Sequence, residues 1–303
     1  MRALVIGFGS IGMRHARILR ELGCKVCVVS SREIDWDCSY HSLSDALQIE
    51  NPQYVIVANK TSEHYQTLLE LEDQGYRGKV FVEKPLFQFE ANMPPHGFEN
   101  IFVGYNLRFH PAIQKLKMLM QGQKILSLHV YTGQYLPQWR PHADYRKTYS
   151  AKKSEGGGVL RDLSHELDYV NWLLDGWESL TAVGGKFSPL EIDSDDIYSI
   201  MLKTKKCPVV TININYIEKS PKRFIIVNTD QDTIKVDMIG NTLTVNERTE
   251  PFEVSRDYTY KMQHEAVLTG KVGDVCYSEE AMDVMNMINA IEEANEKRSW
   301  VSK

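Results

Sequence analysis

The sequence has 303 residues, enough for two domains with separate cores, and its 43% hydrophobic and 25% charged residues are typical of a globular protein. A net charge of −5, with Lys and Arg scattered along the chain, argues against a nucleic-acid partner. Glycines interrupt the apolar opening segment, and no later apolar run reaches the roughly 18 residues needed to span a bilayer, so we expect a cytoplasmic protein with no membrane contact.

The first 104 residues alternate short apolar runs with amphipathic stretches, a pattern typical of βαβ units and a parallel sheet. Strands are predicted at residues 3–6, 26–30, 54–58, 80–82 and 101–103, with helices near 11–22, 43–49 and 63–74. Pro94 and Pro95 predict a loop within the stretch 84–100. We therefore expect an α/β, doubly wound Rossmann domain over residues 1–104.

Residues 105–303 change to an α+β pattern, which predicts a second domain with a mostly antiparallel sheet and helices on one face. The predicted helices are 112–120, 159–174 and 278–296, with a polar loop over 133–155 and strands at 125–132, 197–203, 209–216, 224–228, 233–237 and 242–245. The last helix should bury one apolar side, formed by Ala281, Val284, Met285, Ile288 and Ile291.

A glycine motif follows the first predicted strand and opens a helix. Its spacing permits a tight turn, backbone approach to a pyrophosphate, and close packing of helix on strand, while the helix N-terminus attracts phosphate. A structural turn alone is the alternative, but the surrounding strand–helix–strand order favours dinucleotide binding. The predicted contacts in this motif are Gly7, Gly9, Ser10, Ile11 and Gly12.

The residues at the end of the second predicted strand indicate which dinucleotide binds. NAD-binding folds usually place an acid there, about 20 residues after the glycines, whereas this chain has Ser30, Ser31 and Arg32. A guanidinium and hydroxyls suit a 2′-phosphate, so we expect NADP(H) to be favoured over NAD(H). The alternative is that Arg32 points to solvent and Glu33 serves NAD.

Two further motifs carry side chains suited to proton chemistry. Glu83 and Lys84 stand before Pro85 at the carboxyl edge of the predicted sheet, where such folds bind ligands. Asp162 and His165 follow three glycines on a predicted helix, where residues three apart share a face that Asp168 extends. Taken singly, the first motif also fits a solvated lysine in a turn and the second a structural histidine.

Together with residues 61–64, 104–111 and 172–173, these motifs resemble the Gfo/Idh/MocA family over nearly the full length. The resemblance implies a Rossmann domain followed by an open-faced sheet domain that often builds the oligomer interface, so we expect a homodimer or homotetramer. It also implies a cis peptide bond between Lys84 and Pro85. Implied cofactor contacts beyond the glycine motif are Asn59, Thr61, His64, Glu83, Lys84 and Asn106.

The same resemblance implies Lys84, Asp162 and His165 as the catalytic group, converging beside the nicotinamide. Hydride would pass between the nicotinamide and a sugar carbon, while His165 takes the hydroxyl proton and Lys84 hydrogen-bonds the oxygen. Asp162 would orient the sugar or tune the histidine. Asp162 stands three residues before the histidine, where many relatives have four, Lys60 replaces a common proline, and the 86–100 stretch is short.

The polar loop supplies candidate contacts to a sugar, sugar derivative or nucleotide sugar. Arg140 and Tyr145 suit a polyol or anionic sugar, although the same residues suit packing. Alternatives are a non-catalytic NAD(P)-binding sensor and a reductase of a non-sugar carbonyl or imine. The acidic stretch 193–196 predicts a solvated turn, and Cys24 and Cys27 predict buried thiols, so we expect no metal.

Overall fold

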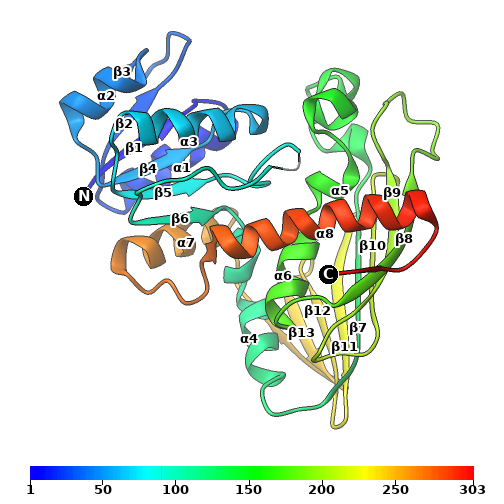
Figure 1. The fold of residues 1–303 in the computed structure, drawn as a ribbon. Coiled ribbons are helices and arrows are strands. Elements are labelled where there is room, and N and C mark those ends of the chain that lie inside the picture. The colour runs from blue at the N-terminus through cyan, green and yellow to red at the C-terminus, as the bar shows by residue number, and fades with distance from the viewer. Residues whose placement is uncertain (90) are drawn as a thin grey trace. The chain divides into compact units, whose positions relative to one another are not determined.

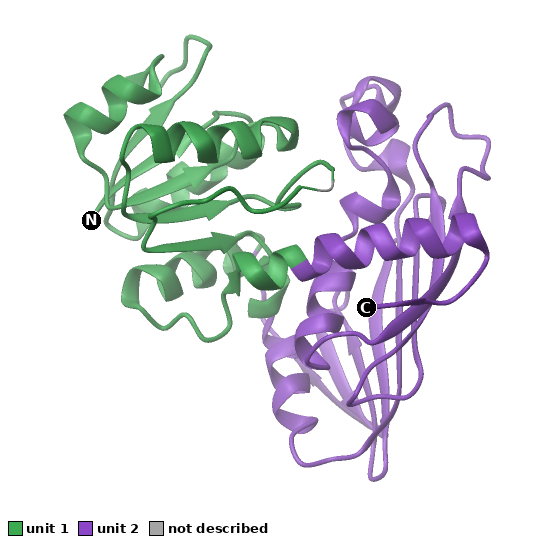
Figure 2. Cartoon of the chain, viewed as in Figure 1, with its two compact units in different colours: residues 1–109, 256–282 green, residues 110–255, 283–303 purple. Residues whose placement is uncertain are grey.

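The computed structural model describes residues 1–89 and 91–303, which form two compact units (Figure 1). Unit 1 comprises residues 1–109 and 256–282, and unit 2 comprises 110–255 and 283–303 (Figure 2). The expected single boundary after residue 104 is therefore corrected, because the chain returns to unit 1. Burial explains the return, since Val267 and Val275 are 0% and 2% exposed in the core of that unit.

Unit 1 contains a seven-stranded sheet in the order β15-β6-β5-β4-β1-β2-β3. All its pairs are parallel except β15 with β6, which confirms the doubly wound Rossmann prediction. The strands are β1 (Arg2–Ile6), β2 (Lys25–Val29), β3 (Ser39–Tyr40), β4 (Tyr54–Val57), β5 (Lys79–Val82), β6 (Asn100–Val103) and β15 (Cys276–Tyr277). Only the two-residue strands β3 and β15 escaped prediction, because they are too short to show a periodicity.

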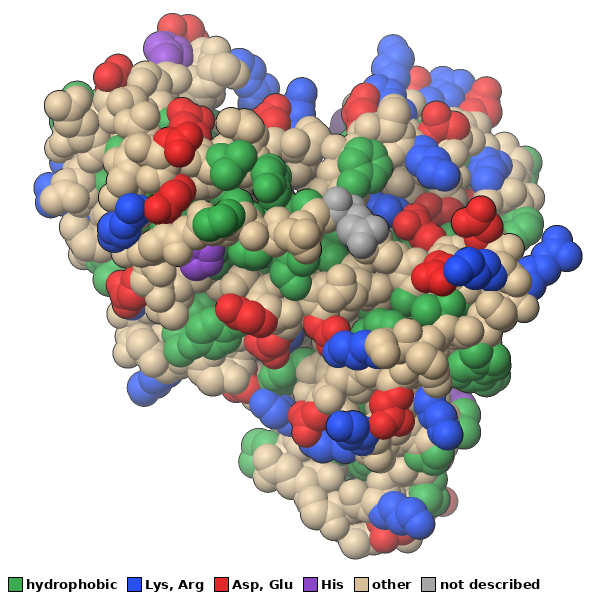
Figure 3. Space-filling view, viewed as in Figure 1, with side chains coloured by type: hydrophobic (Ala, Val, Ile, Leu, Met, Phe, Trp, Pro, Cys, Tyr) green, Lys and Arg blue, Asp and Glu red, His purple; other side chains and the backbone are tan. Residues whose placement is uncertain are grey.

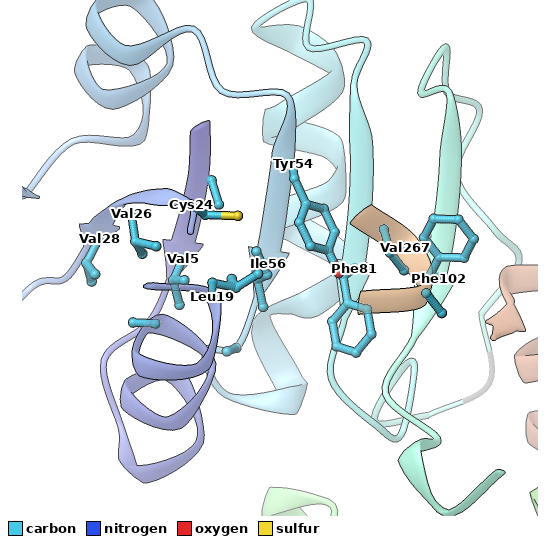
Figure 4. Packing of buried hydrophobic residues seen from close by; sticks show 14 of the residues in the cluster. Val5, Leu19, Cys24, Val26, Val28, Tyr54, Ile56, Phe81, Phe102 and Val267 are labelled. Atoms are coloured by element: carbon cyan, nitrogen blue, oxygen red, sulfur yellow. The ribbon is translucent and has the colours of Figure 1, made fainter. Parts of the chain in front are cut away.

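Four α-helices belong wholly to the described part of unit 1: α1 (Ser10–Glu21), α2 (Leu43–Glu50), α3 (His64–Asp73) and α7 (Tyr258–Thr269). The first three were predicted, whereas α7 was missed because polar residues such as His264 occupy its buried side. Figure 4 shows how the core forms: Val5, Ile56, Phe81 and Phe102 come from neighbouring strands, and Val267 of α7 lies beside Phe81 and Phe102. Each such buried side chain contributes about 1.5–3 kcal/mol.

A disulfide joins Cys27 of β2 to Cys38, just before β3. The expectation of two buried thiols at Cys24 and Cys27 therefore holds only for Cys24, which is a free buried cysteine. Sequence spacing missed the pair because parallel pairing of β2 with β3 places Cys38 beside Cys27.

Unit 2 contains a nine-stranded sheet in the order β14-β13-β12-β11-β7-β10-β9-β8-β16. All its pairs are antiparallel except β7 with β10. The strands are β7 (Ile125–Gly133), β8 (Ser179–Gly185), β9 (Ile197–Lys203), β10 (Val210–Asn215), β11 (Lys222–Thr229), β12 (Thr233–Asp237), β13 (Thr242–Val245), β14 (Arg248–Pro251) and β16 (Val301–Ser302). The missed strands are β8, whose two glycines weaken the strand pattern, and the exposed edge strands β14 and β16.

The helices of unit 2 lie on one face of this sheet (Figure 1). They are α4 (Pro111–Leu119), α5 (Val159–Asp162), α6 (His165–Leu173) and α8 (Ser278–Lys297), which begins in unit 1. The predicted apolar side of α8 is confirmed, because its five residues are 0–2% exposed: Ala281, Val284, Met285, Ile288 and Ile291. The single helix predicted over 159–174 is wrong, because Leu163 leaves the helical conformation (φ −98°, ψ 29°) and α6 starts anew after Ser164.

Candidate functional site

The glycine loop in unit 1 is shaped for close backbone approach. Gly7 has φ +93°, and a Cβ there would lie 2.6 Å from the backbone of Asn59. A Cβ at Gly12 would lie 2.0 Å from the carbonyl oxygen of Gly7, whereas one at Gly9 would meet nothing within 4 Å. Ser10 and Ile11 open α1, whose start has no side-chain cap and no acid in its first turn. The loop therefore fits a dinucleotide pyrophosphate.

The loop after β2 carries the residues expected to select the dinucleotide. The Ser30 hydroxyl accepts from the backbone nitrogen of Arg32 and donates to its carbonyl, both at 3.1 Å, so this hydroxyl shapes the turn. Arg32 is exposed and its Nη2 donates to the Phe8 carbonyl at 3.2 Å, which places the guanidinium at the glycine loop. Ser31 is exposed, and Glu33 lies 3.4 Å from His41.

The loop after β4 holds three of the expected cofactor contacts. Asn59 donates to Thr67 at 2.9 Å, and its buried Oδ1 has no hydrogen-bond partner among the described residues. Thr61 is partly exposed in a 3-10 turn, η1 (Thr61–Glu63). His64 is 1% exposed and bonds through Nδ1 to the Leu86 carbonyl at 3.1 Å, and burial lowers its pKa. His64 thus anchors the segment after Lys84 as a neutral imidazole.

Asn106 lies in a 3-10 turn, η2 (Asn106–Phe109), and is 4% exposed. Its Nδ2 donates to Thr259 near the start of α7 at 2.6 Å. The amide group therefore connects the end of the Rossmann sheet to the returning helix of unit 1.

Lys84 stands at the carboxyl end of β5. Residues 80–88 are buried except Lys84, which is partly exposed, and the expected cis bond to Pro85 is confirmed. Glu83 is 9% exposed, and its Oε2 accepts from the Lys84 backbone nitrogen at 3.3 Å. The fold therefore presents one amine at this strand end, next to a buried carboxyl group.

The break between α5 and α6 produces a similar arrangement in unit 2. Asp162 ends α5 and His165 begins α6. Residues 157–171 are buried except His165, which is partly exposed, and Asp168 is 1% exposed. The imidazole of His165 is therefore the titratable group of this segment that a ligand can reach.

Two tyrosines that the sequence analysis missed surround Asp162. The Tyr216 hydroxyl donates to Asp162 Oδ2 at 2.6 Å. The charge of Asp162 raises the pKa of Tyr149, and burial followed by Asp162 raises the pKa of Tyr216. Tyr216 is the last residue of the predicted strand 209–216 and directly follows β10, and Tyr149 lies in the polar loop, but no local pattern links either to residue 162. The carboxylate orientation is thus fixed by phenols.

Two carboxylates also support the two short helices. Glu166 is 0% exposed and pairs with Arg223, at 2.7 Å to Nε and 3.1 Å to Nη2, and with Thr132 at 2.8 Å. Asp195 accepts from the Leu160 backbone nitrogen at 2.9 Å, and burial raises its pKa to about 6. A Cβ at Gly158, where φ is +123°, would lie 2.2 Å from Asp195, so this close contact explains the glycine before α5.

The acidic stretch before β9 differs from the expected solvated turn. Ser194 and Asp196 are 1% and 0% exposed, and Asp196 accepts from the backbone nitrogens of Phe187 and Ser188, both at 2.9 Å. These residues have a structural role, because the Asp196 carboxylate binds the backbone just after β8 and the Ser194 hydroxyl donates to the Ser150 carbonyl. Among the described residues, one cluster of metal-ligand type occurs, formed by Cys27, Cys38 and Glu50, and the disulfide occupies both sulfurs.

The polar loop contains the two residues expected to contact substrate, Arg140 and Tyr145, and they have different surroundings. Tyr145 contacts the Glu191 backbone nitrogen through its hydroxyl at 3.3 Å. Arg140 is exposed and its guanidinium lies 5.6 Å from the ring centre of Tyr149. Through Tyr149, Arg140 belongs to the same cluster as Asp162, whereas Tyr145 mainly fixes the loop.

Surface charge is mixed. Figure 3 shows Lys and Arg interspersed with Asp and Glu over the visible face. No helix in the described part of the chain is long and apolar enough to cross a bilayer.

Two family models match this chain. The model described as oxidoreductase family, NAD-binding Rossmann fold, matches residues 1–93, and the GFO/IDH/MocA C-terminal domain matches residues 113–234. The uncharacterized oxidoreductase YrbE of Bacillus subtilis (strain 168) is 25% identical over 189 residues, which are 56% of this chain and 52% of that protein. The chain thus matches about half the length of this curated relative.

Solved structures share the fold over the whole chain. GenD2 from gentamicin A biosynthesis, in complex with NAD, has a TM-score of 0.80 at 18% identity, covering 100% of this chain and 96% of its own. Levoglucosan dehydrogenase with NADH and L-sorbose scores 0.83 at 15%, covering 100% and 98%. The WlbA dehydrogenase from Bordetella pertussis, with NADH and UDP-GlcNAcA, scores 0.81 at 19%, covering 100% and 98%. With both of its domains matched, this chain belongs to the GFO/IDH/MocA oxidoreductases, whose first domain is an NAD-binding Rossmann fold.

Proposed function

We propose that this protein transfers hydride between a nicotinamide dinucleotide and a hydroxyl-bearing carbon of a sugar or sugar derivative. The observation that carries the proposal is the exposure pattern. Lys84 and His165 are each the one partly exposed residue of an otherwise buried segment, in a chain whose glycine loop fits a pyrophosphate. An amine and an imidazole are the groups that such a transfer needs, one to stabilise oxygen charge and one to move a proton.

In the oxidising direction, His165 accepts the proton of the substrate hydroxyl while Lys84 donates a hydrogen bond to the same oxygen. A dinucleotide held by the glycine loop would supply the hydride acceptor for that carbon. The Asp162 carboxylate, held by Tyr216 at 2.6 Å, accepts a hydrogen bond from a neighbouring substrate hydroxyl and so orients the sugar. In the reducing direction His165 returns the proton, so either direction uses the same residues.

A sugar is the substrate class favoured by two observations. Levoglucosan dehydrogenase and WlbA were solved with L-sorbose and UDP-GlcNAcA. In this chain Arg140, Tyr149 and Asp162 form one polar cluster that offers charged and hydroxyl groups, which suits a polyol or an anionic sugar.

We further propose that NADP(H) is preferred over NAD(H). Arg32 supports this preference because its guanidinium lies at the glycine loop, and the residues that follow β2 directly are Ser30 and Ser31 rather than an acid. The three solved structures named above contain NAD or NADH, so this preference depends on the local residues of this chain alone.

The protein is proposed to assemble as a homodimer or homotetramer through the uncovered face of the unit 2 sheet. On β9 the alternate residues Ser199, Met201 and Lys203 are exposed, and Val183 of β8, which is 69% exposed, lies opposite Ser199 in the register. A face of this kind, with apolar side chains among polar ones, is typical of protein interfaces. Light scattering of the native protein and of Met201→Glu tests the assembly, because a charge on this face should reduce the measured mass.

The direct test is a screen of free sugars, sugar acids and nucleotide sugars with each oxidised dinucleotide, followed by the absorbance of reduced nicotinamide. We expect turnover with one of these classes, and loss of that turnover in Lys84→Met with the dinucleotide Kd changed less than about threefold. If the dinucleotide binds tightly and no sugar, carbonyl or imine is turned over in either direction, the protein is a sensor and the proposal is wrong.

A further inference from the structure

Unit 1 contains a row of four buried polar side chains that the proposed reaction does not use. Tyr54 begins β4, His264 lies on α7, His15 lies on α1, and Glu83 directly follows β5. The first three are 0% exposed and Glu83 is 9% exposed. The Tyr54 hydroxyl lies 3.0 Å from His264 Nδ1, His264 Nε2 lies 2.7 Å from His15 Nδ1, and His15 Nε2 lies 2.8 Å from Glu83 Oε1. We call these four residues the histidine network.

The donors and acceptors of the network can be assigned from its two ends. An ionised Glu83 only accepts, so His15 carries a proton on Nε2. Burial raises the pKa of Tyr54 well above its ordinary value, so its hydroxyl keeps its proton. Burial, followed by His15, holds the pKa of His264 well below its ordinary value, so that ring is neutral with one acceptor nitrogen.

Of the possible proton arrangements, one satisfies every group. If Tyr54 donates to His264 Nδ1, then His264 donates from Nε2 to His15 Nδ1, and His15 donates from Nε2 to Glu83. If instead His264 donated to Tyr54, His15 would have to be a buried cation, and the phenol proton would have no acceptor among the described residues. Reversing both rings would point a lone pair of His15 at the Glu83 carboxylate, which is repulsive.

We propose that Tyr54 and His264 are positioning residues that hold His15 as its neutral tautomer with the proton on Nε2. This tautomer fixes Glu83 Oε1, and Glu83 Oε2 in turn accepts from the Lys84 backbone nitrogen at 3.3 Å. Gly104 confines Glu83 further, because a Cβ there would lie 2.8 Å from Glu83 Oε1. The network therefore sets the backbone orientation of Lys84 from residues on α7 and β4.

His15 also ties this strand end to the glycine loop, because it lies on α1, the helix that the loop opens. One imidazole thus connects the phosphate-binding helix with the turn that carries Lys84. The effect on turnover rests on the proposed role of Lys84, whereas the tautomer of His15 does not.

The decisive experiment is ¹⁵N NMR of the histidine rings in the native protein near neutral pH, with Tyr54→Phe, His264→Gln and Tyr76→Phe as variants. His15 should show a protonated Nε2 and an unprotonated Nδ1. Tyr54→Phe should change this pattern, and His264→Gln should keep it, because the carboxamide can donate to His15 and accept from Tyr54. Tyr76→Phe is the matched control, since it removes another largely buried phenol, one that donates to the Lys79 carbonyl at 3.0 Å.

With an active substrate in hand, Tyr54→Phe should lower kcat about tenfold with KM and dinucleotide Kd changed less than about twofold, and His264→Gln should retain most of the activity. A native His15 that is doubly protonated or protonated on Nδ1, or a Tyr54→Phe spectrum identical to the native one, overturns the proposal. Because the NMR result needs no substrate, failure of the tautomer assignment and failure of the sugar oxidoreductase proposal are separate outcomes.

Discussion

Lys84 in unit 1 and His165 in unit 2 occupy equivalent settings, each partly exposed within a buried segment, yet the groups that stabilise the two settings differ. Beside Lys84, a phenol and two imidazoles form a chain of hydrogen bonds that ends on a single carboxylate, Glu83. Beside His165, several carboxylates are held by a guanidinium, phenols and backbone nitrogens. The first arrangement depends on the direction of hydrogen bonds and the second on compensation of buried charge, so the two should respond to different substitutions.

Removal of Arg223, the cation that pairs with Glu166 in unit 2, should give the largest loss of stability. Arg223→Met leaves Glu166 at 0% exposure with the Thr132 hydroxyl as its remaining side-chain partner among the described residues. An uncompensated buried charge costs about 3–5 kcal/mol, so the free energy of unfolding, measured with urea, should fall by that amount. Lys297→Met is the control, because its pair with Glu293 is exposed and screened by solvent, so its loss should change the free energy of unfolding little. A loss below about 1 kcal/mol for Arg223→Met would show that charge compensation is unimportant here.

Asp195 should make the stability of unit 2 depend on pH. Burial raises its pKa from 3.8 to about 6, so between these values the folded protein keeps a proton that the unfolded chain releases. Stability is therefore lost as the pH rises through this window, by up to about 3 kcal/mol at pH 7. Asp195→Asn retains an acceptor for the Leu160 nitrogen and cannot ionise.

The melting temperature of Asp195→Asn relative to the native protein should consequently rise between about pH 4 and about pH 7. Asp193→Asn, at an exposed acid two residues away, controls for the general loss of a carboxyl group. Parallel melting curves for native protein and Asp195→Asn across this range would contradict the prediction.

His165→Ala tests whether the exposed imidazole carries the chemistry rather than the fold. We expect turnover to fall about a hundredfold or more, with the dinucleotide Kd nearly unchanged, because general-base catalysis is lost while the glycine loop stays intact. His129→Ala is the matched control, since that histidine lies on the sheet of unit 2 and bonds Thr211 at 2.8 Å. Unchanged turnover would remove His165 from the mechanism.

The sequence predicted the exposed residues of both settings but not the groups that hold them. Lys84 and His165 stand in short motifs with recognisable neighbours, and strands β1, β4 and β5 are plain apolar runs. By contrast, Tyr216 lies 54 positions from Asp162 and His264 lies 249 positions from His15. Such partners are fixed by strand order and by the return of α7 to unit 1, and no local periodicity encodes either.

The smallest expected effect concerns Arg32. It lies in a local turn with Ser30, so the sequence alone was enough to predict it as a cofactor contact. Its Nη2 donates to the Phe8 carbonyl at 3.2 Å, so a 2′-phosphate at the end of β2 would meet a guanidinium already placed at the glycine loop. Arg32→Ala should weaken NADPH about tenfold and NADH less than about twofold, measured as Kd by fluorescence titration, because an exposed charge-assisted contact contributes modestly. Arg77→Ala, which removes an exposed arginine paired with Glu72 in the same unit, should change neither Kd. If NADH binds the native protein as tightly as NADPH, or if Arg32→Ala weakens both dinucleotides equally, Arg32 does not read the 2′-phosphate.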